Sequence, residues 1–297
     1  MILVTGANGF VGRHLISSLL QTGARIRAFV RSYEKGAELQ KKGCDLSLGD
    51  IKDKESIERA LDGITTVYHL IGIRREIGRD TFEEINYKGT KNLVDVMRAK
   101  GVGRLVFLSI VKVSPDSKSR YLLSKWRAEE AIRSSSLKHT IFRSTVIYGP
   151  GGESFTNLAN IVRTAPIIPV IGSGRYLMQP LYVKDLVSVL VRCLENDQTI
   201  NETFEIGGPE AMEFDRVLDE MAQVFGKKRI KLHLPVSLTR LFLALGEKIV
   251  PASLLPLTND ELDLLLIDTI CNPDIVQKRF NISLAPFLDG LKETFLN

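Results

Sequence analysis

Short apolar runs alternate with amphipathic stretches along the first half of the chain. The run 2–5 is rich in β-branched residues and predicts a buried strand, whereas the stretch 13–20, which ends close to Gly23, has the pattern of a helix. By the same criteria we expect strands at 25–30, 44–48, 65–70 and 104–109 and helices at 56–61, 81–99 and 121–132. This alternation predicts an α/β fold, with a Rossmann-like doubly wound parallel sheet and helices on both faces.

Three glycines join the first expected strand to the first expected helix. Gly6, Gly9 and Gly12 are three residues apart, which gives G-x-x-G-x-x-G in place of the G-x-G-x-x-G fingerprint. Glycine lets the backbone approach a pyrophosphate closely, and a helix start offers free N–H groups and the positive end of a dipole. The turn therefore predicts a dinucleotide site at the carboxyl ends of the strands. A tight turn without a ligand is the alternative.

The end of the second expected strand carries a cation. In an NAD-binding sheet an acidic side chain at this position binds the ribose 2′-hydroxyl, but here the position is Arg31, followed by Lys35. A guanidinium binds a 2′-phosphate bidentately, and a charge-assisted hydrogen bond is worth about 1.5–3 kcal/mol. We therefore predict NADP(H) as the preferred cofactor, with Arg13 as a second phosphate contact and NAD(H) as the alternative. Surface charge without a ligand is the other interpretation of each arginine.

Tyr121 and Lys125 lie four residues apart in the helix expected after the fifth strand, so both side chains share one helix face. An ammonium group favours the phenolate form and lowers the pKa of a tyrosine from about 10, which makes it a usable proton donor or acceptor. Such pairs also occur on solvated helix faces, and the position in a dinucleotide fold is what favours catalysis here. His69 is predicted to be a core histidine. Asp50 would accept from adenine or cap the next helix.

Composition and charge exclude several classes of function. The chain has 297 residues, of which 44% are hydrophobic and 25% charged, and these values are ordinary for a globular protein. The net charge of +5 is scattered, so no nucleic-acid partner is expected. Cys44, Cys193 and Cys271 have neither disulfide nor metal spacing, which predicts a reducing cytoplasmic location and no metal. A strand that starts directly after Met1 leaves no room for a signal peptide, and no apolar stretch is long enough to cross a bilayer.

The pattern loosens after residue 150, so we divide the chain there. Residues 1–150 form the expected NAD(P)-binding domain, and 151–297 form a substrate-binding region or small α/β cap, with about 180–206 returning to the sheet as a helix at 184–195 and a strand at 203–206. Two apolar helical stripes follow, at Val217, Leu218, Met221 and Phe225 and at Leu238, Leu241, Phe242, Leu245 and Ile249. Core packing or a subunit contact explains such stripes, and membrane binding is the alternative.

Several motifs in a fixed order carry a family resemblance. They are TGANGFVG at 5–12, Asp50, NYKGT at 86–90, the Tyr121-x-x-x-Lys125 pair, FRS at 142–144 with YGPG at 148–151, and QPLYVKD at 179–185. In these motifs the chain resembles an extended or atypical short-chain dehydrogenase/reductase, of the NAD-dependent epimerase/dehydratase type, over nearly its whole length. The segments 69–73, 117–121 and 257–262 are similar to the branch of the nucleotide-binding alpha-subcomplex accessory subunit of respiratory complex I and its bacterial relatives.

The resemblance implies roles for individual residues. Tyr121 would be the acid/base, Lys125 would bind the nicotinamide ribose and tune Tyr121, and Asn86 would support them. The family's catalytic hydroxyl follows the fifth strand, but Ser109 lies one or two residues early, and Ser114 is the alternative. The implied cofactor contacts are Gly6, Ala7, Asn8, Gly9, Phe10 and Gly12 at the pyrophosphate, Arg13 and Arg31 at the 2′-phosphate, Asp50 and Ile51 at adenine, and Leu70, Ile71 and Gly72 beside the ribose and nicotinamide.

Two functions are compatible with these residues. The Tyr121–Lys125 pair favours an NADP(H)-dependent enzyme that transfers hydride to or from a small carbonyl or alcohol substrate, or its variant, an epimerase or dehydratase of nucleotide sugars. The displaced Ser109 and the apolar second half favour a non-catalytic NADPH-binding structural or assembly protein, whose partner would be a protein complex or a membrane surface. The resemblance also implies a homodimer formed through the helices around Tyr121.

Overall fold

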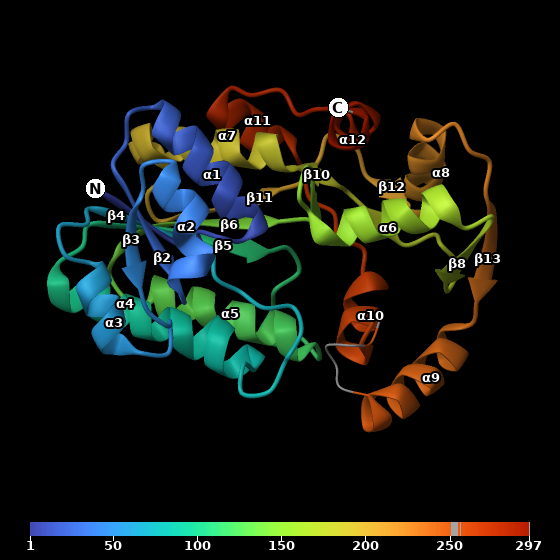
Figure 1. The fold of residues 1–297 in the computed structure, drawn as a ribbon, viewed down its shortest axis with the longest axis horizontal. Helices are drawn as coiled ribbons and strands as arrows, with labels where there is room; N and C mark the ends of the chain where they lie inside the picture. Colours follow the sequence, from blue (N-terminus) through green and yellow to red (C-terminus); the bar gives the residue numbers. More distant parts are fainter. Residues whose placement is uncertain (251–254, 256, 297) are drawn as a thin grey trace. The chain divides into compact units, whose positions relative to one another are not determined.

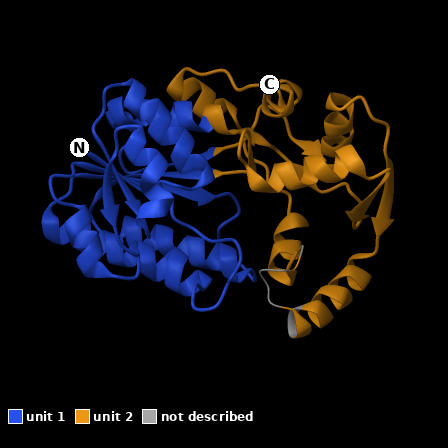
Figure 2. Ribbon diagram, viewed as in Figure 1, with its two compact units in different colours: residues 1–143, 186–205 blue, residues 144–185, 206–297 orange. Residues whose placement is uncertain are grey.

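The computed structural model describes residues 1–250, 255 and 257–296 (Figure 1). These residues form two compact units, shown in Figure 2. Unit 1 contains residues 1–143 and 186–205, and unit 2 contains residues 144–185 and 206–297.

Unit 1 is built on a seven-stranded sheet in the order β11-β6-β5-β4-β1-β2-β3. The strands are β1 (Ile2–Thr5), β2 (Ile26–Val30), β3 (Asp45–Leu48), β4 (Thr66–His69), β5 (Arg104–Ile110), β6 (Lys138–Ser144) and β11 (Glu202–Ile206). Strand β1 pairs in parallel with β2 and β4, β2 with β3, and β4 with β5. The strand order reverses between β1 and β4, and ligands of open α/β sheets bind at such a point. The predicted Rossmann-like doubly wound fold is confirmed.

Helices pack on both faces of this sheet (Figure 1). They are α1 (Phe10–Gln21), α2 (Tyr33–Lys41), α3 (Lys54–Ala60), α4 (Gly89–Lys100), α5 (Arg120–Arg133) and α7 (Val183–Arg192), with short 3₁₀ turns at Cys193–Glu195 and Asp197–Thr199. The apolar core between the sheet and α3, α4 and α5 includes Leu3, Val67, Leu105 and Phe107. On the opposite face the Tyr68 hydroxyl donates a hydrogen bond to the carbonyl of Leu190 in α7 at 2.6 Å.

Two helix starts differ from the sequence prediction for local reasons. The helix expected at 81–99 begins with a π-helical segment, Glu83–Lys88, before α4. The helix expected at 56–61 begins at Lys54, because the Asp53 side chain accepts hydrogen bonds from the backbone N–H groups of Glu55 and Ser56. Asp53 therefore takes the capping role that the sequence left open for Asp50.

Unit 2 is made of short elements around an aromatic core. Its helices are α6 (Glu153–Thr164), α8 (Phe214–Val224), α9 (Val236–Ile249), α10 (Asn259–Leu265), α11 (Asp274–Phe280) and α12 (Phe287–Phe295). Its two-stranded sheets pair β7 (Ile147–Tyr148) with β10 (Leu181–Tyr182), β9 (Leu177–Met178) with β12 (Met212–Glu213), and β8 (Ile167–Ile171) with β13 (Ile230–Leu234). The buried Tyr148 ring contacts Phe155, Tyr182 and Phe287 at centroid distances of 5.0–5.4 Å.

Within residues 1–250, 255 and 257–296, no helix combines the length and apolar character needed to cross a bilayer. The same residues contain no cluster of three or more His, Cys, Asp or Glu side chains able to hold a metal ion.

His69 lies in the core, as predicted, and it makes folding stability depend on pH. Its ring is fully buried, with Nδ1 2.7 Å from the Thr5 hydroxyl and Nε2 2.9 Å from the Thr90 hydroxyl. Burial, helped by the charge of Lys125, lowers the pKa of His69 from 6.5 to about 3. Between these two pH values the unfolded chain binds more protons than the folded chain, so stability falls as the pH falls below 6.5.

We expect the free energy of unfolding to drop by about 3 kcal/mol between pH 6.5 and pH 4 because of this one group, at 1.36 kcal/mol per pH unit. Urea titrations at both pH values would measure the drop. The variant His69→Gln keeps a hydrogen-bonding side chain that does not titrate, so its loss of stability should be smaller by that amount. An equal loss in both proteins contradicts the prediction.

Candidate functional site

The glycine turn between β1 and α1 leaves the start of a helix open to an anion. Gly9 is the N-cap of α1, and in the described structure no side chain caps it and no acidic residue lies in the first turn. A Cβ on Gly12 would overlap the Gly6 carbonyl oxygen and would lie 2.8 Å from that of Ala7. The turn therefore needs glycine for a close backbone approach, and its free N–H groups fit a dinucleotide pyrophosphate.

Neighbouring residues of this turn differ in exposure. Ala7 is fully buried, Asn8 is half-buried and Arg13 is exposed. The half-buried Phe10 ring meets the His14 ring edge-on at 5.5 Å between centroids. The turn thus presents backbone groups and one exposed cation at the carboxyl end of β1.

The loop after β4 touches the glycine turn. Leu70 donates its backbone N–H to the Thr5 carbonyl at 3.2 Å. Gly6 has a φ of +71°, and a Cβ there would lie 2.9 Å from the Leu70 carbonyl carbon and 3.0 Å from the Ile71 nitrogen. Leu70 and Ile71 therefore lie beside the glycine turn, because β1 and β4 are neighbours in the sheet, and Gly72 follows them in the chain.

Asn86 fixes this loop by three hydrogen bonds. Its side-chain oxygen accepts from the backbone N–H of Ile73 at 2.8 Å, and its amide nitrogen donates to the Ile73 carbonyl and to the Ser124 hydroxyl at 3.1 Å each. The Ser124 hydroxyl in turn donates to the Tyr121 carbonyl at 2.7 Å. Asn86, which is 1% exposed, therefore ties the β4 loop to the first turn of α5.

Lys125 is a buried cation that points to the same loop. It is 4% exposed, and its ammonium donates to the Leu108 carbonyl at 2.8 Å and lies 4.2 Å from the centre of the Phe107 ring. Burial lowers its pKa to about 8. A Cβ on Gly72 would lie 3.8 Å from the Lys125 nitrogen and 3.6 Å from the Asn86 oxygen. Gly72, Asn86 and Lys125 thus converge on one point.

Tyr121 lies one helical turn before Lys125, at the start of α5. The residue is 7% exposed, and its ring meets the Phe82 ring at 5.6 Å between centroids. The pKa of Tyr121 differs from the sequence expectation, because burial raises it, and the cation that opposes this increase is Arg74. Tyr121 therefore holds its proton at neutral pH.

Ser109 is engaged on the buried side of α5. Burial opposes ionisation of Glu129, but hydrogen bonds from Arg143 and Ser109 lower the pKa of this carboxyl group. Glu129 is 0% exposed, and Arg143 and Arg133 reach it at 2.7 and 2.5 Å. The serine that sequence reasoning placed near the reacting group thus belongs to an ion network one turn beyond Lys125.

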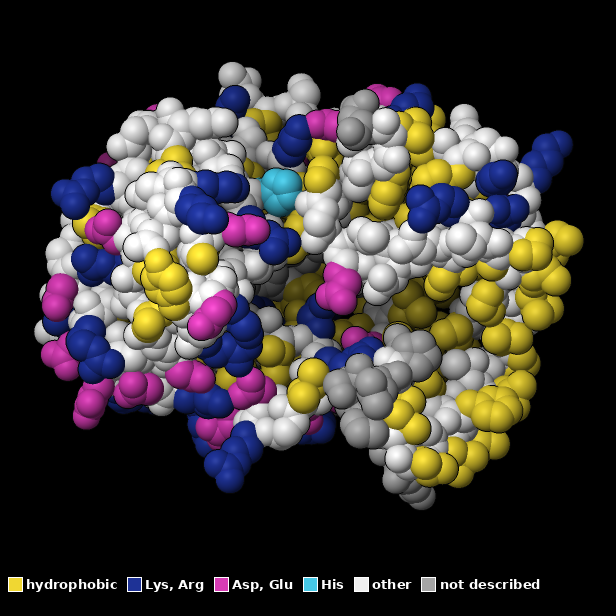
Figure 3. Space-filling view, in the orientation of Figure 1, with side chains coloured by type: hydrophobic (Ala, Val, Ile, Leu, Met, Phe, Trp, Pro, Cys, Tyr) yellow, Lys and Arg dark blue, Asp and Glu magenta, His cyan; other side chains and the backbone are white. Residues whose placement is uncertain are grey.

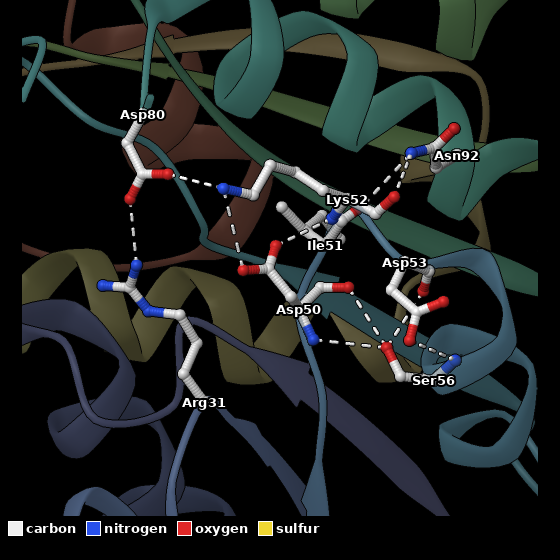
Figure 4. A network of polar contacts seen from close by, with 8 residues as sticks. All are labelled: Arg31, Asp50, Ile51, Lys52, Asp53, Ser56, Asp80 and Asn92. Carbon is white, nitrogen blue, oxygen red and sulfur yellow. Dashed lines mark hydrogen bonds and ion pairs between the residues drawn. The ribbon is translucent and has the colours of Figure 1, made fainter. Parts of the chain in front are cut away.

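Figure 4 shows the polar network at the ends of β2 and β3. Arg31 lies 3.0 Å from one oxygen of Asp80, and the Lys52 ammonium lies 2.7 Å from the other. The hydrogen bond from Lys52, with the one from Arg31, lowers the pKa of Asp80. The backbone N–H of Lys52 donates to Asp50 at 2.9 Å. The network therefore balances two cations with two carboxylates.

Ile51 lies beneath this network. It is 4% exposed, and a Cβ on Gly89 would lie 2.8 Å from its side chain. Its carbonyl accepts a hydrogen bond from Asn92 at 3.3 Å. Ile51 thus anchors the loop after β3 to α4 and holds Asp50 at the end of the strand.

Sequence reasoning missed three residues of this region. Asp80, Lys52 and Glu129 act on Arg31 and Ser109 only through long-range contacts. The sequence places Arg74 in a loop where it faces an anionic substrate or solvent, but it does not indicate its effect on Tyr121. The one available signal was the i, i+4 spacing of Lys125 and Glu129, which places them on one face of α5.

Comparisons with known proteins show which family and which fold the chain resembles. A model described as the NAD dependent epimerase/dehydratase family matches residues 2–207. Subunit 9 of the NADH dehydrogenase [ubiquinone] 1 alpha subcomplex from Arabidopsis thaliana is 27% identical, over 99% of this chain and 76% of that protein. Ceramide reductase from Caulobacter vibrioides is 29% identical over 64% of this chain and 60% of that protein. The structure of Citrobacter sp. triphenylmethane reductase has the same fold, with a TM-score of 0.79 at 20% identity over 100% of this chain and 99% of that one.

Proposed function

The chain belongs to the NAD-dependent epimerase/dehydratase family, and we propose that it is an NADP(H)-dependent oxidoreductase that reduces a carbonyl group with Tyr121 as the proton donor. One observation carries the proposal. Lys125 is buried, its ammonium converges with Asn86 on Gly72, and Tyr121 lies one turn away. An ammonium group is costly to bury, so a lysine in this position indicates a functional site.

A nicotinamide dinucleotide, when bound, supplies the hydride. The residues of the chain bind the dinucleotide and transfer the proton. The glycine turn at 6–12 and the N-terminus of α1 would bind the pyrophosphate, and Asn86 keeps the β4 loop in the position that admits the nicotinamide ribose. Tyr121, which is protonated at neutral pH, donates its hydroxyl proton to the carbonyl oxygen. The charge of Arg74, which favours the phenolate, then stabilises the anion that remains, and Lys125 would bind the nicotinamide ribose.

Cofactor exchange tests this function directly. Trp126, the one tryptophan of the chain, follows Lys125 in α5 and serves as the fluorescent reporter. We expect NADPH to quench it, and excess NADP to displace NADPH at about 1 per second or faster, since typical enzymes turn over at that rate. A panel of aldehydes and ketones should then oxidise NADPH over many turnovers. Release of NADPH over many minutes, with no oxidation of NADPH by any substrate of the panel, contradicts the proposal that the chain is an enzyme.

The preference for NADP(H) rests on Arg31 and Lys52. Both cations lie at the end of the sheet where a 2′-phosphate would lie, but the Asp80 carboxylate lies between them. A 2′-phosphate has to replace Asp80 as their partner, whereas a ribose 2′-hydroxyl gains little from either cation. Asp80 is therefore an internal competitor that weakens NADPH binding.

We expect Asp80→Asn to tighten NADPH binding by about tenfold and Arg31→Asp to weaken it by about tenfold to a hundredfold, since a charged hydrogen bond is worth about 1.5–3 kcal/mol. NADH affinity should change little in either variant. Calorimetric titration with both cofactors measures the ratio of the NADPH affinity to the NADH affinity. Asp95, whose carboxylate pairs with Lys54 and Lys91, provides the control variant Asp95→Asn, which should leave the ratio unchanged. Equal changes for NADPH and NADH contradict the role in phosphate binding.

A second candidate function is a nucleotide-binding protein that does no turnover. The engagement of Ser109 by the Glu129 network favours it, because this leaves the family's catalytic hydroxyl without an obvious equivalent. The Arabidopsis relative, aligned over 99% of this chain, is named as a subunit of NADH dehydrogenase. Slow release of a tightly bound nucleotide would favour this candidate, or an epimerase that retains its cofactor.

A further inference from the structure

The β8–β13 ribbon of unit 2 has large apolar side chains on its outer face. In the parallel register Ile167 lies opposite Ile230 and Pro169 opposite Leu232. Ile167, Ile230 and Leu232 are 49%, 66% and 53% exposed. On the inner face β8 buries Ile168 and Val170, whereas β13 contributes Lys231, which lies 2.8 Å from a carboxylate oxygen of Asp219. Strand β8 is therefore apolar on both faces, and the apolar side chains of the outer face are exposed.

Helix α9 continues the apolar surface, starting two residues after β13 ends. Five of its large apolar side chains are 45–81% exposed and recur every three or four residues, so they share one helix face. Figure 3 shows hydrophobic side chains gathered over β8, β13 and α9. We call this surface the apolar strip and define it by Ile167, Ile230, Leu232, Leu238, Leu241, Phe242, Leu245 and Ile249.

The sequence around the strip is strongly basic. Residues 221–249 include six Lys or Arg residues and one Glu. Arg240 pairs with Asp263, and Arg229 donates to the carbonyls of Val162 and Arg163. Lys227 and Lys228, in the turn before β13, are exposed, and within the described part of the chain neither is ion-paired with a carboxylate.

We propose that the apolar strip docks on the surface of a membrane that contains anionic phospholipids. Leu, Ile and Phe side chains on one helix face enter the boundary between headgroups and acyl chains, and lysines beside them are attracted to the anionic surface. Protein interfaces are instead often anchored by Tyr and Trp, and the strip contains neither residue. The proposal does not depend on the proposed function.

Flotation of the full chain with vesicles tests the docking. We expect binding to vesicles of phosphatidylcholine mixed with phosphatidylglycerol, weaker binding in high salt, and little binding to phosphatidylcholine alone. The variant Leu241→Glu with Phe242→Glu should lower the affinity for anionic vesicles by tenfold or more, as should Lys227→Glu with Lys228→Glu. The control variant is Ile275→Glu in α11, at a side chain that is 58% exposed and outside the strip. It should bind vesicles like the parent.

Circular dichroism and thermal unfolding, measured for every variant, report whether the chain remains folded. The absence of binding to anionic vesicles overturns the proposal, and so does equal binding by the parent and both double variants. Light scattering distinguishes a membrane from the alternative occupant of the strip, a second copy of the chain. A dimeric parent that becomes monomeric in the Leu241→Glu, Phe242→Glu variant and floats with no vesicle shows that the strip is an interface between two copies of the chain.

Discussion

Replacing Tyr121 by Phe should slow the reduction of an identified carbonyl substrate by about 10²–10⁴-fold, the usual contribution of a positioned proton donor. Affinity for NADPH should stay within about twofold, because Phe keeps the ring that packs against Phe82 at 5.6 Å between centroids. The loss should therefore appear in kcat and not in cofactor binding. Single-turnover oxidation of NADPH, followed by absorbance, measures the rate of the chemical step.

Tyr68→Phe is the matched control for this substitution. Tyr68 is also a buried tyrosine of unit 1, but its hydroxyl donates to the Leu190 carbonyl on the face of the sheet that carries α7. Removing that hydroxyl should lower the free energy of unfolding by about 1 kcal/mol and leave the rate unchanged. A Tyr121→Phe variant that reacts as fast as the parent would remove Tyr121 from the mechanism.

Local sequence patterns predicted the parts of the site that lie within one element. The glycines at 6–12 form one turn between a strand and a helix. Tyr121 and Lys125 are one helical turn apart in α5, so their spacing alone predicts that both side chains lie on the same helix face. The Rossmann-like sheet followed from the alternation of strands and helices. These features depend on backbone geometry more than on which distant side chains meet.

The parts that the sequence did not predict depend on contacts between distant residues. Asp80 meets Arg31 across 49 positions of sequence, and Glu129 meets Arg143 across 14. Such ion pairs join residues from loops and neighbouring strands, and the periodicity of hydrophobic residues in the sequence does not predict them. Lys125 was expected to lower the pKa of Tyr121, but burial, which spacing cannot reveal, raises it.

The β8–β13 ribbon was missed for a different reason. Pro166 and Pro169 bracket a short Ile-Ile segment, to which the sequence assigns no strand, since proline cannot donate to a strand ladder. A two-stranded sheet has only edge strands, and Pro169 is tolerated in β8 for that reason. Its partner β13 lies about 60 residues later. Strand β13 does alternate apolar and polar residues, but its apolar side chains Ile230 and Leu232 are exposed, so the alternation does not mark a buried face here.

The second large effect should come from Gly12, where Gly12→Ala should weaken NADPH binding by about a hundredfold or more. The added Cβ would overlap the Gly6 carbonyl oxygen and lie 2.9 Å from the Ala7 carbonyl carbon, and both are backbone atoms that cannot rotate away. The turn has to open, which moves the N–H groups at the start of α1 away from a pyrophosphate. Such overpacking should also lower the free energy of unfolding by about 1–3 kcal/mol.

Gly103→Ala separates the loss of binding from general damage. A Cβ on Gly103 would meet the Thr65 carbonyl oxygen at 3.5 Å, an ordinary contact, so this variant should bind NADPH like the parent. Calorimetric titration of both variants at a temperature where each is folded gives the ratio of affinities. If Gly12→Ala binds NADPH as tightly as Gly103→Ala does, the glycine turn does not hold the pyrophosphate. The preference proposed for Arg31 and Asp80 would then fail as well, because it requires a nucleotide whose pyrophosphate is held at the N-terminus of α1.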